Sequence, residues 1–355
     1  MVVKVSRLVG LCLASAVLLA SGAACAEVAD SSLLAEAHAK YDAGQLDQAE
    51  VLFARLLERF PSSSLAPDAQ YYLGWIAHKK NTGKAEARWQ AVVDRYPKSP
   101  EAPKALMGIA AVHYKASAPK EARLTDFEKV VLLYPRSPEA EEAWFRIGSL
   151  HNRIPPDFDK SLAAFQYLVE NATNPKWQAE AYVQIGFTYL QRYWHEGRKN
   201  PGDLDWAMNV FSSARTVFPD QGDAVARGEL RQVKRYLYSE RDPVKARQAL
   251  NEILRAYPET SSTTEIFYQI AYCSFAEKDY LTCIQLCERI IVERPPSDWN
   301  CYLQYFIGNC YLQADRKADA KAAFEETMRL YPGTNWAKNA EGVLSTLNFE
   351  EEVVP

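Results

Sequence analysis

The stretch Tyr302–Pro332, YLQYFIGNCYLQADRKADAKAAFEETMRLYP, is the clearest copy of a unit that recurs along most of the chain. In its first half, apolar residues such as Leu303, Phe306 and Cys310 recur at the spacing of one helix face. The polar break Ala314–Arg316 separates this run from a second apolar run, which ends at a proline. The stretch therefore predicts a helical hairpin.

The proline that ends this unit makes the period of the repeat countable. Prolines at the equivalent place lie between 36 and 44 residues apart. The dipeptides are Phe60-Pro61, Tyr96-Pro97, Tyr134-Pro135, Asn174-Pro175, Phe218-Pro219, Tyr257-Pro258, Arg294-Pro295 and Tyr331-Pro332. Such a period, with two helices per unit, is typical of an α-solenoid, so we expect about eight hairpins.

Small and bulky residues also recur at fixed places in these units. In five units, a small residue of the second helix is followed four positions later by a bulky one: Ala49 and Phe53, Ala85 and Trp89, Ala207 and Phe211, Ala246 and Leu250, Ala320 and Phe324. The first helix carries its own small residue: Gly74, Gly108, Gly148, Gly186, Ala271 or Gly308. Small residues let two helices approach closely and bulky residues fill the space between them, so these slots predict where each hairpin packs.

This pattern resembles the tetratricopeptide repeat over most of the chain. The resemblance implies an all-α, right-handed solenoid of about eight hairpins over residues 27–348. A C-terminal capping helix is expected at Trp336–Leu347, followed by an acidic tail at residues 349–355 that contains Glu350–Glu352. Because each repeat contacts its neighbours in series, one elongated body is expected.

Two phrases indicate a particular kind of tetratricopeptide protein. Ala66–Gly74, APDAQYYLG, and Tyr96–Ala102, YPKSPEA, are similar to sequences in two families of bacterial envelope protein. One is the periplasmic Tol-Pal-associated coordinator of cell division, and the other is the tetratricopeptide lipoprotein of the outer-membrane β-barrel assembly machine. The first has a coiled coil before its repeats and the second is shorter and lipidated. The resemblance therefore implies a compartment and a kind of role, but not one complex. A serine followed by proline, as in YPKSPEA, also predicts an N-cap for the next helix.

The segment Met1–Ala26 lies outside the repeats and has the pattern of a secretory signal peptide. Lys4 and Arg7 form a charged start, an apolar run continues to Ala20, and small residues surround Cys25. Two alternatives stay open. Cys25 could be lipidated, although the position three residues earlier is not the usual leucine. A retained anchor would need a longer apolar run, of about 20 residues.

The composition fits a well-packed protein, with 48% hydrophobic and 24% charged residues. The formal net charge is −4 and becomes −6 once Lys4 and Arg7 are removed with the signal peptide. A mildly acidic chain with interspersed charges argues against nucleic acid as the partner.

Two units depart from the pattern. The fifth carries an insertion, Arg192–Asp205, expected between its two helices, and the sixth has Lys234 where a glycine is expected. Insertions fall on one face of a solenoid, often the binding face, so Trp194 and Arg198 are candidates for partner contact. The alternative is that the aromatic side chains of the insertion fold back over exposed helix ends.

No chemistry-bearing motif predicts an enzyme. The five histidines are scattered, with no pair at helical metal-ligand spacing, and neither HExxH nor GxSxG occurs. We therefore expect no catalytic residues, no metal site and no cofactor.

The cysteines that follow the signal peptide gather in the last two full repeats: Cys273, Cys283, Cys287, Cys301 and Cys310. Their spacing and the lack of a nearby histidine argue against a zinc site. Several occupy core slots of the repeat, which predicts buried small hydrophobic residues. A disulfide is the alternative in an oxidising compartment.

The resemblance to tetratricopeptide domains implies that the first helix of each unit faces a concave groove, with contact positions just after the glycine and three residues before it. These positions and the insertion give nine candidates for partner binding: Tyr71, Trp75, Phe145, Phe187, Trp194, Arg198, Tyr268, Tyr272 and Tyr305. Aromatic rings suit an extended peptide or a sugar face, because they offer large contact area with little loss of entropy. The alternative is that individual rings pack between repeats.

The sequence thus predicts a periplasmic scaffold or adaptor of a cell-envelope complex, with association with the outer membrane as an option. We expect it to bind an envelope protein, through an extended peptide, on the concave face. A solenoid that binds peptidoglycan or another polysaccharide is the alternative. No nucleic acid partner is expected, and no transmembrane span after removal of the signal peptide.

Overall fold

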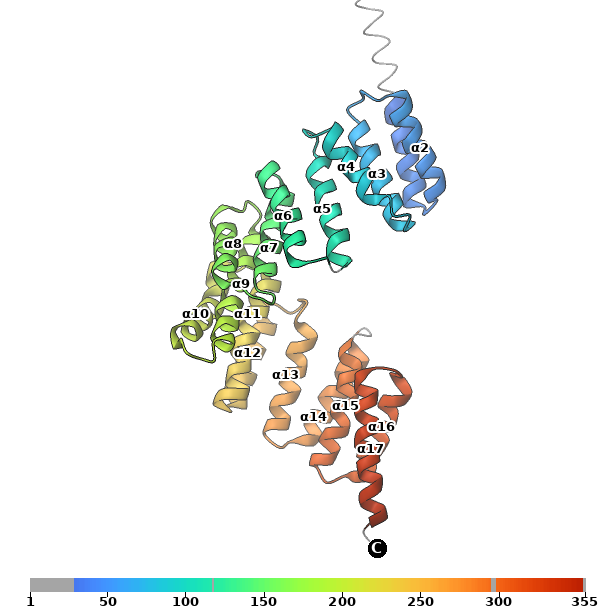
Figure 1. The fold of residues 1–355 in the computed structure, drawn as a ribbon. Coiled ribbons are helices and arrows are strands. Elements are labelled where there is room, and N and C mark those ends of the chain that lie inside the picture. Colours follow the sequence, from blue (N-terminus) through green and yellow to red (C-terminus); the bar gives the residue numbers. More distant parts are fainter. Residues whose placement is uncertain (1–28, 117, 295–297, 354–355) are drawn as a thin grey trace, which may run out of the picture. The chain divides into compact units, whose positions relative to one another are not determined.

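The computed structural model describes residues 29–353 except residue 117 and residues 295–297 (Figure 1). The predicted signal peptide and Cys25 lie outside the described residues. Within the described part, the ordered elements are helices and no β-strand occurs.

The helices follow one another as the predicted series of hairpins. Residues 29–42 form the first helix. The following elements are α2 (Leu46–Arg59), α3 (Ala66–Lys79), α4 (Ala85–Arg95), α5 (Glu101–Lys115), α6 (Lys120–Leu133), α7 (Pro138–His151), α8 (Phe158–Asn171), α9 (Pro175–His195), α10 (Pro201–Val217), α11 (Gly222–Arg235), the π-helix η1 (Tyr236–Glu240), α12 (Pro243–Ala256), α13 (Thr263–Ala276), α14 (Tyr280–Glu293), α15 (Asp298–Gln313), α16 (Lys317–Leu330) and α17 (Asn335–Val353). The predicted all-α solenoid with a C-terminal helix is confirmed.

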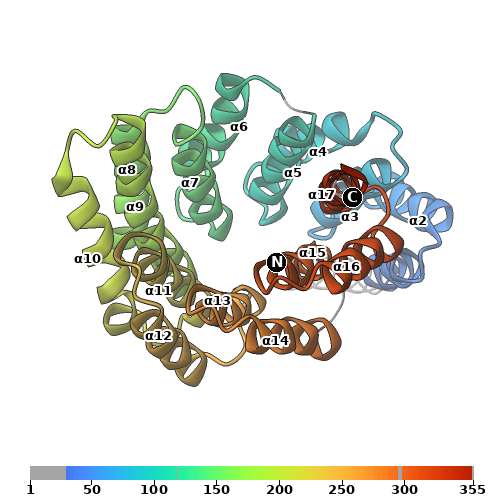
Figure 2. The ribbon, with the colours of Figure 1, turned by 90° about the horizontal axis from the view of Figure 1, so that it is seen from below.

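The chain divides into two compact units, one ending at Ala164 and the other beginning at Phe165. In both units, the odd-numbered helices contact one another: α3 with α5 and α5 with α7 in the first, and α9 with α11, α13 with α15 and α15 with α17 in the second. Figure 2 shows α11 and α13 of the second unit in one layer, with α12 and α14 in the other. The first helices of the hairpins therefore form a row within each unit.

The glycine and aromatic slots meet inside the hairpins, as their spacing predicts. A Cβ atom added at Gly308 would lie 2.5 Å from Cε1 of Phe324, and one at Gly186 would lie 2.6 Å from Cε1 of Phe211. Both phenylalanine rings are fully buried. Glycine is required at these places because any larger residue would overlap a ring that the core holds in place.

The prolines of the repeat mostly follow the end of a helix, but the fourth does not. Aromatic residues that precede a proline, such as Phe60 and Phe218, are helix C-caps. Pro175 instead begins α9, and the side chain of Asn174 accepts a hydrogen bond from the Lys176 backbone nitrogen at 3.0 Å. An Asn-Pro pair suits a helix start better than a helix end, because Asn caps the free N–H groups and Pro fits the first turn.

The serine-proline pair of YPKSPEA, Ser99-Pro100, occurs again as Ser137-Pro138 after Tyr134-Pro135, and only the second serine caps the helix that follows. Ser137 caps α7 and accepts a hydrogen bond from the Ala140 backbone nitrogen at 3.2 Å. The hydroxyl of Ser99 is buried without a hydrogen-bond partner among the described residues. There Pro100 stands at the N-cap of α5 in helical conformation, so the helix start lies one residue later relative to the serine.

The insertion at Arg192–Asp205 is mostly helical, which corrects the expectation of a connecting segment. It lengthens α9 to 21 residues and α10 to 17 residues, and only residues 196–200 lie between them. Arg198 turns the chain in the left-handed region at a φ of 64°. A tertiary contact stabilises the longer helices. Arg192 of α9 forms a bidentate ion pair with Asp203 of α10, which is only 1% exposed.

The C-terminal helix α17 begins at Asn335 and continues to Val353, through the acidic residues Glu350–Glu352. It packs on α15 and α16, as a capping helix should. Its Trp336 ring lies 4.6 Å from the Tyr302 ring and 5.2 Å from the Tyr305 ring. The expected cap is therefore present and longer than Trp336–Leu347.

The cysteines of the last two repeats are buried, and Cys273, Cys283, Cys287 and Cys310 are thiols. The Cys310 thiol donates a hydrogen bond to Sγ of Cys283 over 3.4 Å, whereas a disulfide bond is about 2.05 Å long. Burial raises the pKa of Cys273 to about 12. These cysteines therefore serve as small core residues, as the repeat pattern predicts.

We expect Cys273, Cys283 and Cys310 to remain reduced in the purified protein, because all three are fully buried in the core, where dissolved oxidants do not reach the sulfur atoms. Alkylation in denaturant without reductant, followed by peptide mass mapping, should modify all three. A peptide pair joined through Cys283 and Cys310 would contradict this expectation.

A pH dependence of stability is expected from His113 in the first unit. Its Nδ1 lies 2.6 Å from Oδ2 of Asp126, and its Nε2 lies 3.4 Å from Oε2 of Glu86. The hydrogen bond with Asp126 raises the pKa of His113. A raised pKa in the folded state stabilises the protein below the unfolded value of about 6.5, and this contribution disappears as pH rises through the folded pKa.

The variant His113→Gln keeps a hydrogen-bond donor but cannot titrate. We expect the wild type to be more stable than the variant at about pH 6 and the difference to vanish by about pH 9. Urea unfolding at both pH values measures the difference. The comparison also cancels the opposite effect of His151, whose pKa is lowered by burial. An equal difference at both pH values would show that His113 acts by packing alone.

Candidate partner-binding site

Three pockets open along the rows of first helices. The first, here called the arginine pocket, has a volume of about 740 Å³ and lies between α9, α10, α11 and η1. The second, here called the aromatic pocket, has a volume of about 500 Å³ and is lined by α11, η1, α13, α15 and α17. Both belong to the second unit. A third, of about 360 Å³, lies between α3, α5, α6 and α7 of the first unit.

The arginine pocket has an apolar floor. The floor is formed by Phe187 and Leu190 from α9 and by Leu204 and Met208 from α10. The Phe187 ring packs on the buried Phe211 ring with 5.1 Å between centroids, so the hairpin core holds it in place. Such a floor can receive an aliphatic or aromatic side chain of a partner.

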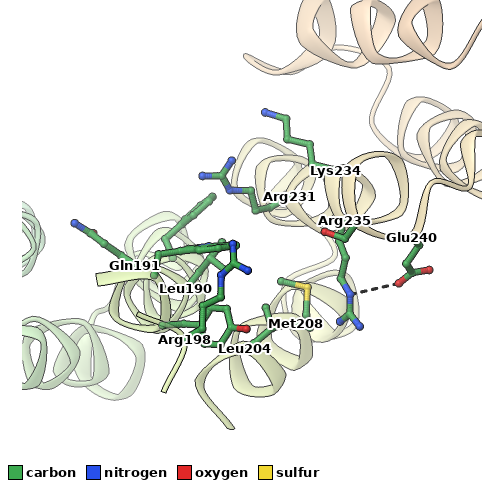
Figure 3. A pocket seen from close by; sticks show the side chains of 13 residues that line it. Leu190, Gln191, Arg198, Leu204, Met208, Arg231, Lys234, Arg235 and Glu240 are labelled. Atoms are coloured by element: carbon green, nitrogen blue, oxygen red, sulfur yellow. Dashed lines mark ion pairs between the residues drawn. The ribbon is translucent and has the colours of Figure 1, made fainter. Parts of the chain in front are cut away.

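The rim of the arginine pocket is cationic. Arg198, Arg231, Lys234 and Arg235 line it, together with a single carboxylate, Glu240. Figure 3 shows Arg231 and Lys234 extending from α11, and Arg235 paired with Glu240 at 3.3 Å. Lys234 also pairs with Glu265, so Arg198 and Arg231 are the two cations that pair with no carboxylate among the described residues. These two charges can attract an anion, although the chain as a whole is acidic.

Aromatic rings support two of these guanidinium groups. The Arg198 guanidinium lies 4.3 Å from the centre of a Trp194 ring, and that of Arg231 lies 5.6 Å from the Phe187 ring. Stacking on a ring orients a guanidinium while leaving its N–H groups able to bind a carboxylate. Trp194 itself is 53% exposed. The insertion therefore builds a wall of the pocket, and its tryptophan does not fold back into the core.

The pocket of the first unit contains two of the predicted residues, Tyr71 and Trp75, whose rings meet edge to face at 6.4 Å. Its rim carries charges of both signs, among them Glu142 and Arg146, which pair at 2.9 Å. Burial raises the pKa of Tyr71, which remains neutral. The first unit therefore offers a smaller pocket without the cationic excess of the arginine pocket.

The nine residues predicted for partner binding fall into two groups. Six line pockets: Tyr71, Trp75, Phe187, Trp194, Arg198 and Tyr268. The other three are half-buried and line none of the three pockets. Tyr272 packs on Tyr268 and Phe306, Tyr305 packs on Phe324 and Trp336, and Phe145 lies on α7. For Tyr272 and Tyr305 the alternative of packing between repeats holds.

Several pocket residues were not among the sequence candidates: Arg231, Arg235, Tyr238, Gln269, Trp299, Tyr302 and Trp336. Tyr302 could have been found, because it lies three residues before the candidate Tyr305, on the same face of α15. Trp336 belongs to the capping helix, and Tyr238 lies in the π-helix η1, where the repeat register changes. No sequence spacing predicts these two positions.

The described residues contain no group of three or more His, Cys, Asp or Glu side chains that could hold a metal ion. No helix in the described part of the chain is long and apolar enough to cross a membrane.

Comparisons with known proteins agree with this architecture. A tetratricopeptide repeat model matches residues 34–84 and 80–141, and the YfiO model, described as an outer membrane lipoprotein, matches residues 229–350. No curated protein matches the sequence. Among solved structures, yeast Tom70 is similar with a TM-score of 0.56 and 13% identity, over 87% of this chain and 60% of that chain. A tetratricopeptide repeat protein from Parabacteroides merdae matches with a TM-score of 0.43 and 14% identity, over 90% of this chain and 98% of that chain.

The chain resembles tetratricopeptide-repeat proteins, whose family model matches it over residues 34–84 and 80–141. Its C-terminal third, which contains the aromatic pocket and much of the cationic rim, resembles the outer membrane lipoprotein family. The structural similarities are at low identity and concern the fold alone, and the chain spans 60% of the length of Tom70. The two family matches support a protein-interaction scaffold in the cell envelope.

Proposed function

We propose that this protein is a scaffold of the bacterial cell envelope that binds a partner protein in the arginine pocket, on the row of first helices of the second unit. The single observation that carries the proposal is the combination of an apolar floor with two ring-stacked arginines on the rim, Arg198 and Arg231, that pair with no carboxylate among the described residues. The partner segment that fits is acidic and carries a bulky apolar side chain. An extended peptide meets this description, because its side chains and backbone can follow a groove between helices.

The family resemblance and the N-terminal pattern support the location in this proposal. In this proposal Met1–Ala26 is a signal peptide, the repeats work in the periplasm, and the outer membrane lipoprotein match supports a place near the outer membrane. Mass measurement of the protein purified from the periplasm tests the processing. An N-terminus at Glu27 supports simple secretion, and a lipid-modified Cys25 would support anchoring instead.

Site-specific photo-crosslinking in living cells tests the binding face. A photoreactive residue at Trp194 or at Arg231 should give a crosslinked partner. The same residue at Leu281, which is exposed on α14 in the other layer, should give none. Crosslinks of equal yield at all three positions would contradict a specific binding face.

Once the crosslinked partner is identified, peptides from its sequence test whether the bound segment is acidic. Peptides from its acidic stretches should bind the full chain more weakly as salt rises, because exposed charges are screened. Arg198→Ala and Arg231→Ala should each weaken binding. The matched control is Arg289→Ala, which removes an exposed arginine of α14 that pairs with Glu293. An affinity that does not change with salt would show that the cationic rim does not contribute to binding of the partner.

A further inference from the structure

The aromatic pocket differs in chemistry from the arginine pocket beside it. Five aromatic side chains line it: Tyr238, Tyr268, Trp299, Tyr302 and Trp336. They come from η1, α13, α15 and α17, so the pocket exists only when these elements are assembled. Trp299, Tyr302 and Trp336 are half-buried, and Tyr238 is 49% exposed, so ring surface remains open in the pocket.

The rings are held rigidly. The hydroxyl groups of Tyr268 and Tyr302 lie 2.6 Å apart in a hydrogen bond, and Tyr268 is almost fully buried. The Tyr268 ring lies 5.4 Å from a Trp299 ring, and the Tyr302 ring lies 4.6 Å from a Trp336 ring. The Tyr238 hydroxyl donates a hydrogen bond to Oε1 of Gln269 at 3.2 Å. A ligand would therefore meet preformed aromatic surfaces, which lowers the entropy lost on binding.

Gln269 provides a polar group directed at the pocket. Its side chain lines the pocket and is only 3% exposed. The carbonyl oxygen accepts the Tyr238 hydrogen bond, and the amide NH₂ donates to no protein atom among the described residues. Because an amide NH₂ can donate two hydrogen bonds, this group is suited to donate to a bound molecule.

An ion pair completes the polar lining without adding net charge. Lys234 and Glu265 both line the pocket and pair with each other. They offer additional donors from the ammonium group and acceptor positions on the carboxylate. The pocket therefore combines flat apolar surfaces with both kinds of hydrogen-bonding group and a net charge of zero.

We propose that the aromatic pocket binds a β-linked pyranose oligosaccharide. A pyranose ring with equatorial substituents has a flat face of C–H groups that packs on an indole or phenol ring. Its hydroxyl groups lie at the edge, and each can both donate and accept a hydrogen bond, as Gln269, Lys234 and Glu265 require. This ligand is distinct from the protein partner proposed for the arginine pocket.

Two other classes of ligand fit less well. A quaternary ammonium group is also bound by aromatic rings, but here the one lining carboxylate, Glu265, is already neutralised by Lys234. A proline-rich peptide also binds aromatic grooves, but its carbonyl groups only accept hydrogen bonds. It would add no donor for the second oxygen of Glu265, which Lys234 contacts through Oε1. A saccharide uses all the groups that the pocket presents.

Saturation-transfer NMR with the full chain tests the proposal. The probes are tetra-N-acetylchitotetraose and cellotetraose, both β-linked, and maltotetraose, which is α-linked. We expect transfer to the ring protons of at least one β-linked probe and weaker transfer to maltotetraose. Trp299→Ala should weaken the affinity for the β-linked probe about fivefold to tenfold, through loss of one aromatic contact. Gln269→Leu, which keeps the side-chain size, should also weaken it.

The matched control is Trp206→Ala, which removes a tryptophan of α10 that is 59% exposed and does not line the aromatic pocket. It should leave saccharide binding unchanged. Circular dichroism and melting curves establish that each variant is folded, and Gln269→Leu carries the test if Trp299→Ala unfolds.

Three results would overturn the proposal. They are no transfer from the folded wild type at several millimolar probe, equal binding by the wild type and both pocket variants, and tighter binding of choline or a proline decapeptide than of every saccharide. Because crosslinking at Trp194 reports on the arginine pocket, failure here leaves the proposed scaffold function to its own test.

Discussion

Replacing Gly308 with alanine is expected to lower the free energy of unfolding of the second unit by about 2 kcal/mol or more. The added Cβ would lie 2.5 Å from Cε1 of Phe324, and two further atoms of the same ring lie within 2.8 Å of it. The ring is fully buried between α15 and α16 and packs against Tyr305, so it has little room to move. The hairpin must therefore open or the ring must leave its favoured position.

Gly342→Ala is the matched control for this effect. Gly342 also lies inside a helix, α17, but a Cβ there would have no neighbour within 4 Å. Alanine should stabilise that helix by about 0.5 to 1 kcal/mol, because glycine loses more backbone freedom on folding.

Urea unfolding, combined with hydrogen exchange of α15 and α16, separates the two variants. Phe324→Leu in the Gly308→Ala background should recover part of the loss by making room. If Gly308→Ala and Gly342→Ala had equal effects, the close contact between glycine and ring would not be the basis of the repeat.

The second large effect is expected from Arg192→Ala, which should cost about 3 kcal/mol of stability. Arg192 donates to both carboxylate oxygens of Asp203, at 2.8 Å and 2.6 Å, and Asp203 is almost fully buried. Asn200 adds a hydrogen bond to the same carboxylate at 3.2 Å but carries no charge. Removal of the arginine leaves a buried carboxylate without its cation, which costs more than the ion pair itself contributes.

The same change should weaken partner binding in the arginine pocket. The ion pair joins the last turn of α9 to the first turn of α10, and these turns carry Trp194 and Leu204 into the pocket wall. A fluorescence or calorimetric titration with the partner peptide should show the loss.

The control is Arg329→Ala, which removes an exposed arginine that pairs with Glu326 three residues earlier on α16. Exposed pairs contribute little, so its effect should stay below about 0.5 kcal/mol. The double variant Arg192→Met/Asp203→Leu should be more stable than Arg192→Ala, because no buried charge remains. A loss for Arg192→Ala no larger than that for Arg329→Ala would show that water reaches Asp203.

The repeat architecture could be predicted from the sequence because a helical hairpin depends on residues close together in the chain. The small residue of the first helix and the ring of the second, as in Gly308 and Phe324, are 16 positions apart and pack together within one hairpin. Every hairpin repeats this spacing, so the weak indications from the individual hairpins combine into one clear pattern. The positions of Pro175 and of the insertion were misjudged where the spacing departs from the average.

The binding surfaces could be predicted only in part. The slots around the glycine include Phe187 and Tyr268, which line pockets. The slots do not predict which rings remain exposed to a ligand. Tyr305 occupies the same kind of slot, but Trp336 of the capping helix packs on it.

The sequence by itself thus determined the class of fold, the number of hairpins and the residues that form their cores, since these depend on local spacing and on burial of apolar surface. Only the tertiary structure decided where charge and aromatic surface gather. Arg198 and Arg231 come from two hairpins and line one pocket, and Tyr238 lines the other together with Trp336, nearly 100 residues further along the chain. Such meetings depend on helix length, on the π-helix that shifts the register after α11, and on the rotation of each helix in its layer. Small local changes in the sequence alter helix length and helix rotation, and the spacing of the repeat does not predict these changes.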